Sequence, residues 1–233
     1  MNKRAFILTT IVGAAALSLC ALSARAEDGS ITGTIKYGGT APKPKSVEVT
    51  KDKEVCGLKP HFEEDLIVGA DGGIANAVVY IADAKAEPKP ETVDFDQKGC
   101  DYLPHVLAFP AGSTVKIKND DGILHNIHTY STKNPSINIA QPKFKKVVDV
   151  KVEQPELIRV TCDAHGWMHG WWFSAANPYY AVTDDKGNFT IKDVPPGDYE
   201  VTIWQEKLGE QKQKVSVKAG APTTLDVTMK PKA

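Results

Sequence analysis

Three residues whose side chains bind soft or borderline metal ions stand at even spacing in one short segment. In VTCDAHGWMHGWWF, residues 160–173, Cys162 is followed by His165 and then by Met168, each three positions after the last. A further histidine, His125, lies upstream in NDDGILHNIH. Blue-copper electron-transfer sites use two imidazoles, one thiolate and a weak axial thioether. The pattern therefore predicts a mononuclear copper site whose Cys, His and Met come from one loop and whose second His comes from a distant strand.

The segments that must position these residues show the alternation of apolar and polar side chains that is typical of β-strands. Turn sequences such as DDKGN, VPPGD and KAGAP separate several of them. Helical periodicity over a useful window is missing, so we expect an all-β chain built of β-sandwiches. The expected strands are residues 30–37, 76–83, 113–119, 145–152, 156–162, 187–194, 198–205, 213–219 and 223–229.

The region from about 91 to 178 resembles the cupredoxins, closest in loop length to amicyanin and the plastocyanin-like proteins. The resemblance rests on FPAGSTVKIKNDD, LHNIH and CDAHGWM. It implies a Greek-key β-sandwich, one copper ion, and an Asn126 side chain that ties the two ligand loops together. It also implies that the electron leaves by the edge of His165. The copper ligands implied by the family are His125, Cys162, His165 and Met168.

Three further histidines, His105, His128 and His169, lie in or near these motifs and are possible extra ligands. His169 directly follows Met168 and could compete with it as the axial donor. Asp121 is interpreted as a turn residue, because Asx turns explain such positions without any chemistry.

The last third of the chain resembles the carboxypeptidase regulatory-like family, whose small β-sandwiches are similar to transthyretin. The resemblance rests on TDDKGNF, VPPGDYEV and KAGAPTTLDVTM, but the first strands of such a domain are missing there. GSITGTIKYGG and IANAVVYIAD look like those strands, so we expect a sandwich that is split by an insertion. The whole chain also resembles periplasmic methylamine-utilisation-like proteins. The predicted parts are a signal peptide (1–26), an N-terminal β segment that completes the C-terminal sandwich (27–90), a cupredoxin-like domain (91–178) and a regulatory-like sandwich (179–233).

The first 26 residues have the three-part pattern of a secretory signal peptide, with Lys3 and Arg4 before an apolar stretch and a small-x-small end at Ala26. An uncleaved membrane anchor and a lipoprotein acylated at Cys20 are the alternatives. Cleavage would place the protein in the periplasm or outside the cell, with no membrane span left. The chain has 28 basic and 29 acidic residues, and the basic residues form no dense patch in the sequence. This argues against a nucleic-acid partner.

After cleavage three cysteines would remain, and an oxidising compartment favours one disulfide with one cysteine left over. The odd thiol could be buried or could pair between chains. In the alternative that fits a metal site, Cys162 is a metal thiolate while Cys56 and Cys100 form the disulfide.

These patterns predict a periplasmic copper protein that transfers single electrons and is not an enzyme. Its expected partner is a redox protein such as a c-type cytochrome or a periplasmic dehydrogenase. Two other functions stay open: a copper carrier or buffer without a fast redox role, and a binding or scaffold module without redox chemistry.

Overall fold

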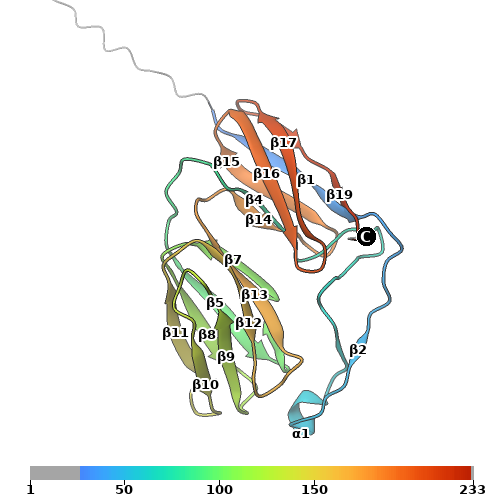
Figure 1. Cartoon of the computed structure of the whole chain (residues 1–233), viewed down its shortest axis with the longest axis vertical. Helices are drawn as coiled ribbons and strands as arrows, with labels where there is room; N and C mark the ends of the chain where they lie inside the picture. The colour runs from blue at the N-terminus through green and yellow to red at the C-terminus, as the bar shows by residue number, and fades with distance from the viewer. Residues whose placement is uncertain (1–26, 232–233) are drawn as a thin grey trace, which may run out of the picture.

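The computed structural model describes residues 27–231, so the predicted signal peptide lies outside the described residues. Within that range the chain has 19 strands and a single helix of four residues, α1 (Lys53–Cys56). Figure 1 shows two β-sandwiches, one above the other, and a long connection at one side that carries α1. The predicted all-β fold class is confirmed. No helix in the described range is long and apolar enough to cross a membrane.

The first sandwich, the lower body in Figure 1, contains two sheets that enclose one core. Its five-stranded sheet runs in the order β10 (Asn138–Gln141), β9 (His125–Tyr130), β12 (Glu156–Thr161), β13 (His169–Ala175) and β7 (Val106–Pro110). Its four-stranded sheet runs in the order β11 (Val147–Val152), β8 (Ser113–Asn119), β5 (Thr92–Lys98) and β6 (Asp101–Leu103). The alternation seen in the sequence is the alternation of burial: Val115 and Ile117 of β8 are fully buried, while Lys116 between them is not.

Strand pairing explains how distant ligands can meet. β9 is antiparallel to β12, with Thr129 opposite Val160 and His128 opposite Thr161. The end of β12 therefore lies beside the start of β9, where His125 stands. β12 and β13 are themselves antiparallel neighbours, so the loop between them, residues 162–168, closes directly over that end of the sheet.

The second sandwich combines strands from both ends of the described chain. β1 (Gly29–Tyr37) is antiparallel to β15 (Asn188–Val194) and parallel to β18 (Pro222–Thr224) and β19 (Val227–Met229). The other sheet runs in the order β14 (Tyr180–Val182), β4 (Val78–Ile81), β16 (Gly197–Gln205) and β17 (Gly209–Val217). The first sandwich is thus inserted between strands of the second.

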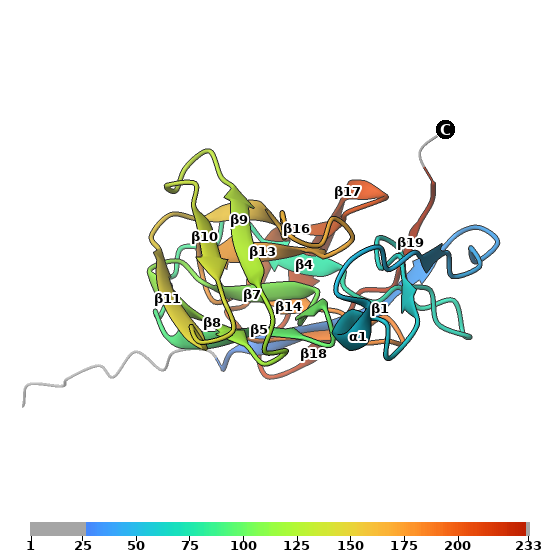
Figure 2. The same ribbon diagram turned by 90° about the horizontal axis from the view of Figure 1, so that it is seen from below.

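Residues 38–77, here called the arm, connect β1 to β4 and include β2 (Ser46–Val47), α1 and β3 (His61–Phe62). In Figures 1 and 2 the arm leaves the second sandwich near β19 and carries α1 to the end of the first sandwich. A disulfide between Cys56 of α1 and Cys100 fixes the arm there. This is the pairing predicted in the alternative that keeps Cys162 as a metal ligand.

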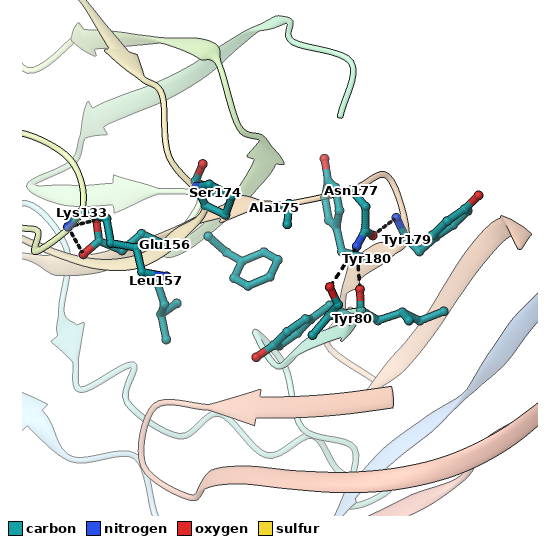
Figure 3. A pocket seen from close by; sticks show the side chains of 14 residues that line it. Tyr80, Lys133, Glu156, Leu157, Ser174, Ala175, Asn177, Tyr179 and Tyr180 are labelled. Atoms are coloured by element: carbon teal, nitrogen blue, oxygen red, sulfur yellow. Dashed lines mark hydrogen bonds between the residues drawn. The ribbon is translucent and has the colours of Figure 1, made fainter. Parts of the chain in front are cut away.

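The two sandwiches share an apolar contact. Val78 and Trp204 of the second sandwich pack in one buried cluster with Val106, Phe173 and Ala175 of the first. A pocket between the sandwiches, shown in Figure 3, opens beside this contact. Two of its polar side chains are already bonded within the protein: Glu156 accepts hydrogen bonds from residues 131–134, and Asn177 donates to the Ile81 carbonyl.

Candidate metal centre

Three donor side chains predicted from the sequence lie together at the end of the first sandwich. The Cys162 Sγ atom is 4.0 Å from His125 Nδ1 and 3.7 Å from His165 Nδ1, and the two Nδ1 atoms are 3.0 Å apart. Both histidines are fully buried, and Cys162 is 2% exposed. With bonds of about 2.3 Å to sulfur and about 2.05 Å to nitrogen, a trigonal ion would separate sulfur from nitrogen by about 3.8 Å. The two sulfur–nitrogen distances lie within about 0.2 Å of that value, whereas the two nitrogens, which such an ion would separate by about 3.55 Å, would have to move apart by about 0.5 Å.

The ligand loop is held by its own backbone and by Asn126. The Cys162 amide donates to the Met168 carbonyl at 3.0 Å, and the Met168 amide donates to the His165 carbonyl at 2.9 Å. Asn126 Oδ1 accepts hydrogen bonds from the amides of Asp163 and Ala164. Since Asn126 directly follows His125, its side chain joins the two ligand-bearing segments, which is the role that the cupredoxin resemblance implied.

Each imidazole is also held by a carboxylate on its outer edge. His125 Nε2 lies 2.9 Å from Asp121 Oδ2, and His165 Nε2 lies 2.8 Å from Asp52 Oδ2. An ionised carboxylate only accepts, so both Nε2 atoms donate, and in a neutral ring Nδ1 then carries the lone pair. Two lone pairs that face each other at 3.0 Å repel unless a proton or a cation lies between them. The donor set therefore fits a cation.

Neither carboxylate was identified as functional in the sequence. The interpretation of Asp121 as a turn residue is incomplete, because it also accepts hydrogen bonds from the Gly99 and Cys100 amides and from His125. Asp52 carries no sequence signal of this role. It precedes α1 in a left-handed conformation, with φ 48°, and its side chain makes no cap hydrogen bond to the helix. The carboxylate is directed to His165 instead.

The electrostatics of the cluster favour an ionised sulfur. Burial raises the pKa of Cys162, but hydrogen bonds from His125 and His165 outweigh it and lower the pKa to about 6. Burial opposes the charge on His125, whereas its contacts with Asp121 and Cys162 raise the pKa of His125 to about 9. The metal-free cluster thus holds a thiolate beside a proton, and a metal ion would replace that proton.

Met168 is 2% exposed and belongs to the same buried apolar cluster as Cys162 and Trp172. Trp167, in the same loop, packs beside His165, with its ring centroid 5.1 Å from that of His165. Its indole nitrogen donates to the Cys100 carbonyl at 3.2 Å. The coordination role of Met168 stays a prediction, but both side chains contribute to a site from which water is largely excluded.

The three additional histidines do not join this cluster. His128 lies on β9, three residues after His125, and strand alternation turns it to the opposite face. Its Nδ1 is 3.1 Å from Asp163 Oδ1, and its ring stacks on Tyr130. His105 and His169 belong to a separate group with Glu206, described below. The expectation that these histidines supply extra ligands to the same ion finds no support in their contacts.

The chain thus consists of two β-sandwiches. The buried cluster of Cys162, His125 and His165 lies at one end of the first sandwich. Residues 174–230, which contain β14 to β19, match the family model of the carboxypeptidase regulatory-like domain. No curated protein matches the chain.

Solved structures similar to parts of the chain include three copper proteins or cupredoxins. A purple cupredoxin from Nitrosopumilus maritimus is 21% identical, and the match covers 36% of this chain and 99% of that one, with a TM-score of 0.31. Amicyanin from Paracoccus versutus is 15% identical over 41% of this chain and 96% of that one, with a TM-score of 0.32. A copper-containing nitrite reductase from Thermus scotoductus is 22% identical over 40% of this chain and only 25% of that one, with a TM-score of 0.31. Values this low carry no argument about function.

Proposed function

We propose that this chain is a copper protein of the periplasm or the extracellular space that transfers single electrons. One copper ion would be held by His125, Cys162 and His165, with Met168 as a weak axial donor. The observation that carries the proposal is the buried set of three donor atoms, in which both imidazoles are oriented by carboxylates and the thiol is poised to ionise.

Copper is the metal that this donor chemistry suits best. A thiolate and a thioether stabilise Cu(I), and imidazole is a good ligand in both oxidation states. When bound, copper would supply a one-electron couple. The residues of the chain would orient the donors, through Asp121, Asp52 and Asn126, and would exclude water. Four protein donors would leave no open position for a substrate, so we propose an electron carrier and not an enzyme.

The burial of the site favours electron transfer over a carrier or buffer function. An ion that must be exchanged needs an accessible donor, whereas His165 is fully buried and its outer edge meets Asp52. Asp52 is itself 30% exposed, so the chain from His165 to Asp52 is a short route from the ligands to the surface. We propose a partner redox protein, such as a c-type cytochrome or a periplasmic dehydrogenase, that docks over this edge.

Visible and electron-spin spectra of the Cu(II)-loaded chain test the proposal. We expect an intense thiolate-to-copper band that disappears on reduction and is absent from Cys162→Ser. The His128→Gln variant is the matched control, since it removes a histidine near the site that makes no contact with the three donors, and it should keep the band. A colourless complex that cannot be reduced would refute the proposal. A coloured complex that exchanges its ion quickly but reacts slowly with a soluble cytochrome would favour the carrier function.

A further inference from the structure

A second group of metal-binding side chains lies where the two sandwiches and the arm meet. His105 precedes β7, and His169 is the first residue of β13, so both belong to the first sandwich. Glu206 follows β16 of the second sandwich, and Asp65 belongs to the arm. The ligand atoms of His105, His169 and Glu206 all lie within 4.8 Å of one another. Segments that are far apart in the sequence thus bring two imidazoles and the Glu206 carboxylate together, and Asp65 of the arm lies beside His169.

The contacts of His169 set the geometry of this group. Its Nδ1 lies 3.2 Å from the Trp167 carbonyl, which can only accept, so in the neutral ring Nε2 carries the lone pair. That Nε2 is 3.4 Å from Glu206 Oε1 and 3.4 Å from Asp65 Oδ1. Neither contact has hydrogen-bond geometry. A tetrahedral Zn²⁺ site with bonds of about 2.05 Å has ligand atoms about 3.4 Å apart, so these distances match the edges of such a site.

His105 supplies a second, independent observation. The residue is 5% exposed, and its Nδ1 is a buried atom without a hydrogen-bond partner among the described residues. Glu64 Oε2 lies 3.3 Å from that atom and could accept from it with a small movement. With the ring proton on Nδ1 and donated to Glu64, Nε2 would carry the lone pair that can bind a metal ion. At present His105 Nε2 lies 2.8 Å from Glu206 Oε2, and joint coordination would need this separation to grow by about 0.5 Å.

The charges balance a divalent cation. With a metal bound, both imidazoles would be neutral and Glu206 and Asp65 would contribute two negative charges, while the charge of Glu64 beside His105 is offset by Lys207 beside Asp65. The Glu206 side chain is only 9% exposed. Asp65 Oδ2 is bonded to Lys207 at 3.0 Å, which leaves Oδ1 directed at His169. A surface groove lined by Asp65, Trp167 and His169 gives an ion a way in.

We propose that His105, His169 and Glu206 form a second metal site for a divalent cation of the Zn²⁺ class, with Asp65, beside His169, as the side chain that would complete the donor set. The donor set contains nitrogen and carboxylate oxygen but no sulfur, so it selects a different kind of ion from the thiolate cluster. The site is independent of the proposed copper function. Its cation would join the two sandwiches and the arm, and it would fix the orientation of His169, which directly follows Met168.

Zinc titration of the chain already loaded with copper tests this site. We expect one further equivalent of Zn²⁺ to bind while the visible band stays unchanged. Glu206→Gln and His169→Gln should each weaken this binding by more than about tenfold, and His128→Gln should leave it intact. Cys162→Ser should lose the copper band but keep the zinc equivalent, so failure of either site can be told from failure of the other.

Thermal unfolding supplies a second measurement that does not depend on copper. Zn²⁺ alone should raise the unfolding temperature of Cys162→Ser, but not that of Cys162→Ser combined with Glu206→Gln. If the double variant fails to fold, Asp65→Asn, at a partly exposed position, replaces Glu206→Gln in the comparison. Absence of a second equivalent in the wild-type chain, or equal zinc uptake by the wild type, Glu206→Gln and His169→Gln, would overturn the proposal and leave the group as an ion-pair network.

Discussion

The two carboxylates behind the imidazoles should respond differently to the same substitution. Asp121 accepts three hydrogen bonds: the Gly99 amide on Oδ1, and the Cys100 amide and His125 Nε2 on Oδ2. Asparagine replaces one of these oxygens by a donor. Whichever way the amide is turned, its NH₂ group then faces at least one other N–H donor. Asp121→Asn therefore loses a charge and also leaves a buried donor unpaired.

The magnitude follows from these contacts. A hydrogen bond to a charged acceptor contributes about 1.5–3 kcal/mol and a neutral one about 0.5–1.5 kcal/mol, so the support of His125 weakens by about 1–1.5 kcal/mol. At about 1.4 kcal/mol per tenfold, this corresponds to about a 5- to 12-fold loss, and we expect Asp121→Asn to bind copper at least this much more weakly because the unpaired donor disturbs the support of His125 further. The unpaired backbone donor should lower the free energy of unfolding of the metal-free chain by about 1–3 kcal/mol.

Asp52→Asn is the matched comparison. Among the described residues, the Asp52 side chain has His165 as its hydrogen-bond partner and is 30% exposed, so the amide can turn its oxygen to Nε2 without a conflict. The same exchange of a charged for a neutral acceptor weakens the support of His165, but water screens this contact at a partly exposed side chain, so we expect less than about a fivefold loss of copper affinity. The free energy of unfolding should change by less than about 1 kcal/mol. Competition with a chromophoric chelator measures the affinity, and urea unfolding of the metal-free chains measures the stability. Equal effects of the two substitutions on affinity would refute the reasoning from hydrogen bonds.

Two further predictions concern stability. Burial raises the pKa of Glu156, but hydrogen bonds from Ser131 and neighbouring groups outweigh it and lower the pKa to about 2, from 4.5. Its contribution, roughly 1–2 kcal/mol after allowing for solvent screening, is thus present above pH 4.5 and is lost as the pH falls from 4.5 towards 2. In urea unfolding across this range, the wild type should be more stable than Glu156→Gln at neutral pH, and the two curves should converge near pH 2; parallel curves would contradict the assignment. The second prediction concerns the disulfide, which closes a loop whose ends are 44 residues apart. Replacing Cys56 and Cys100 together by serine should lower the free energy of unfolding by about 4 kcal/mol. A loss below about 1 kcal/mol would mean that other contacts hold the arm.

About half of the described strands could be predicted from the sequence, because their two faces differ in burial. In β8 and β15, buried and exposed side chains alternate almost without interruption, and the periodicity reports this directly. β7 was not predicted, because both of its faces are largely buried and its sequence VLAFP shows no alternation. A run of apolar residues contains no information about which other strand it will pair with.

The clustering of Cys162, His165 and His125 was predictable for a local reason. Cys162 and His165 share one loop, which follows β12. His125 begins β9, and the antiparallel pairing of β9 with β12 brings His125 near that loop. The supporting residues were not, because Asp52 comes from the arm and Glu206 from the loop after β16. Their positions depend on how the arm and the two sandwiches pack together. No spacing within the sequence encodes that packing.

The interleaving of the two sandwiches sets an order in which the chain can complete its structure during synthesis. All strands from β5 to β13 are contiguous, so the first sandwich has its partners as soon as residue 175 has been made. β1 must wait for β15, β18 and β19, and β4 for β14 and β16. Until then these early strands present unpaired edges, which are prone to join other chains. The risk of aggregation thus lasts throughout the synthesis of the inserted domain and ends only when the last strands of the second sandwich have been made.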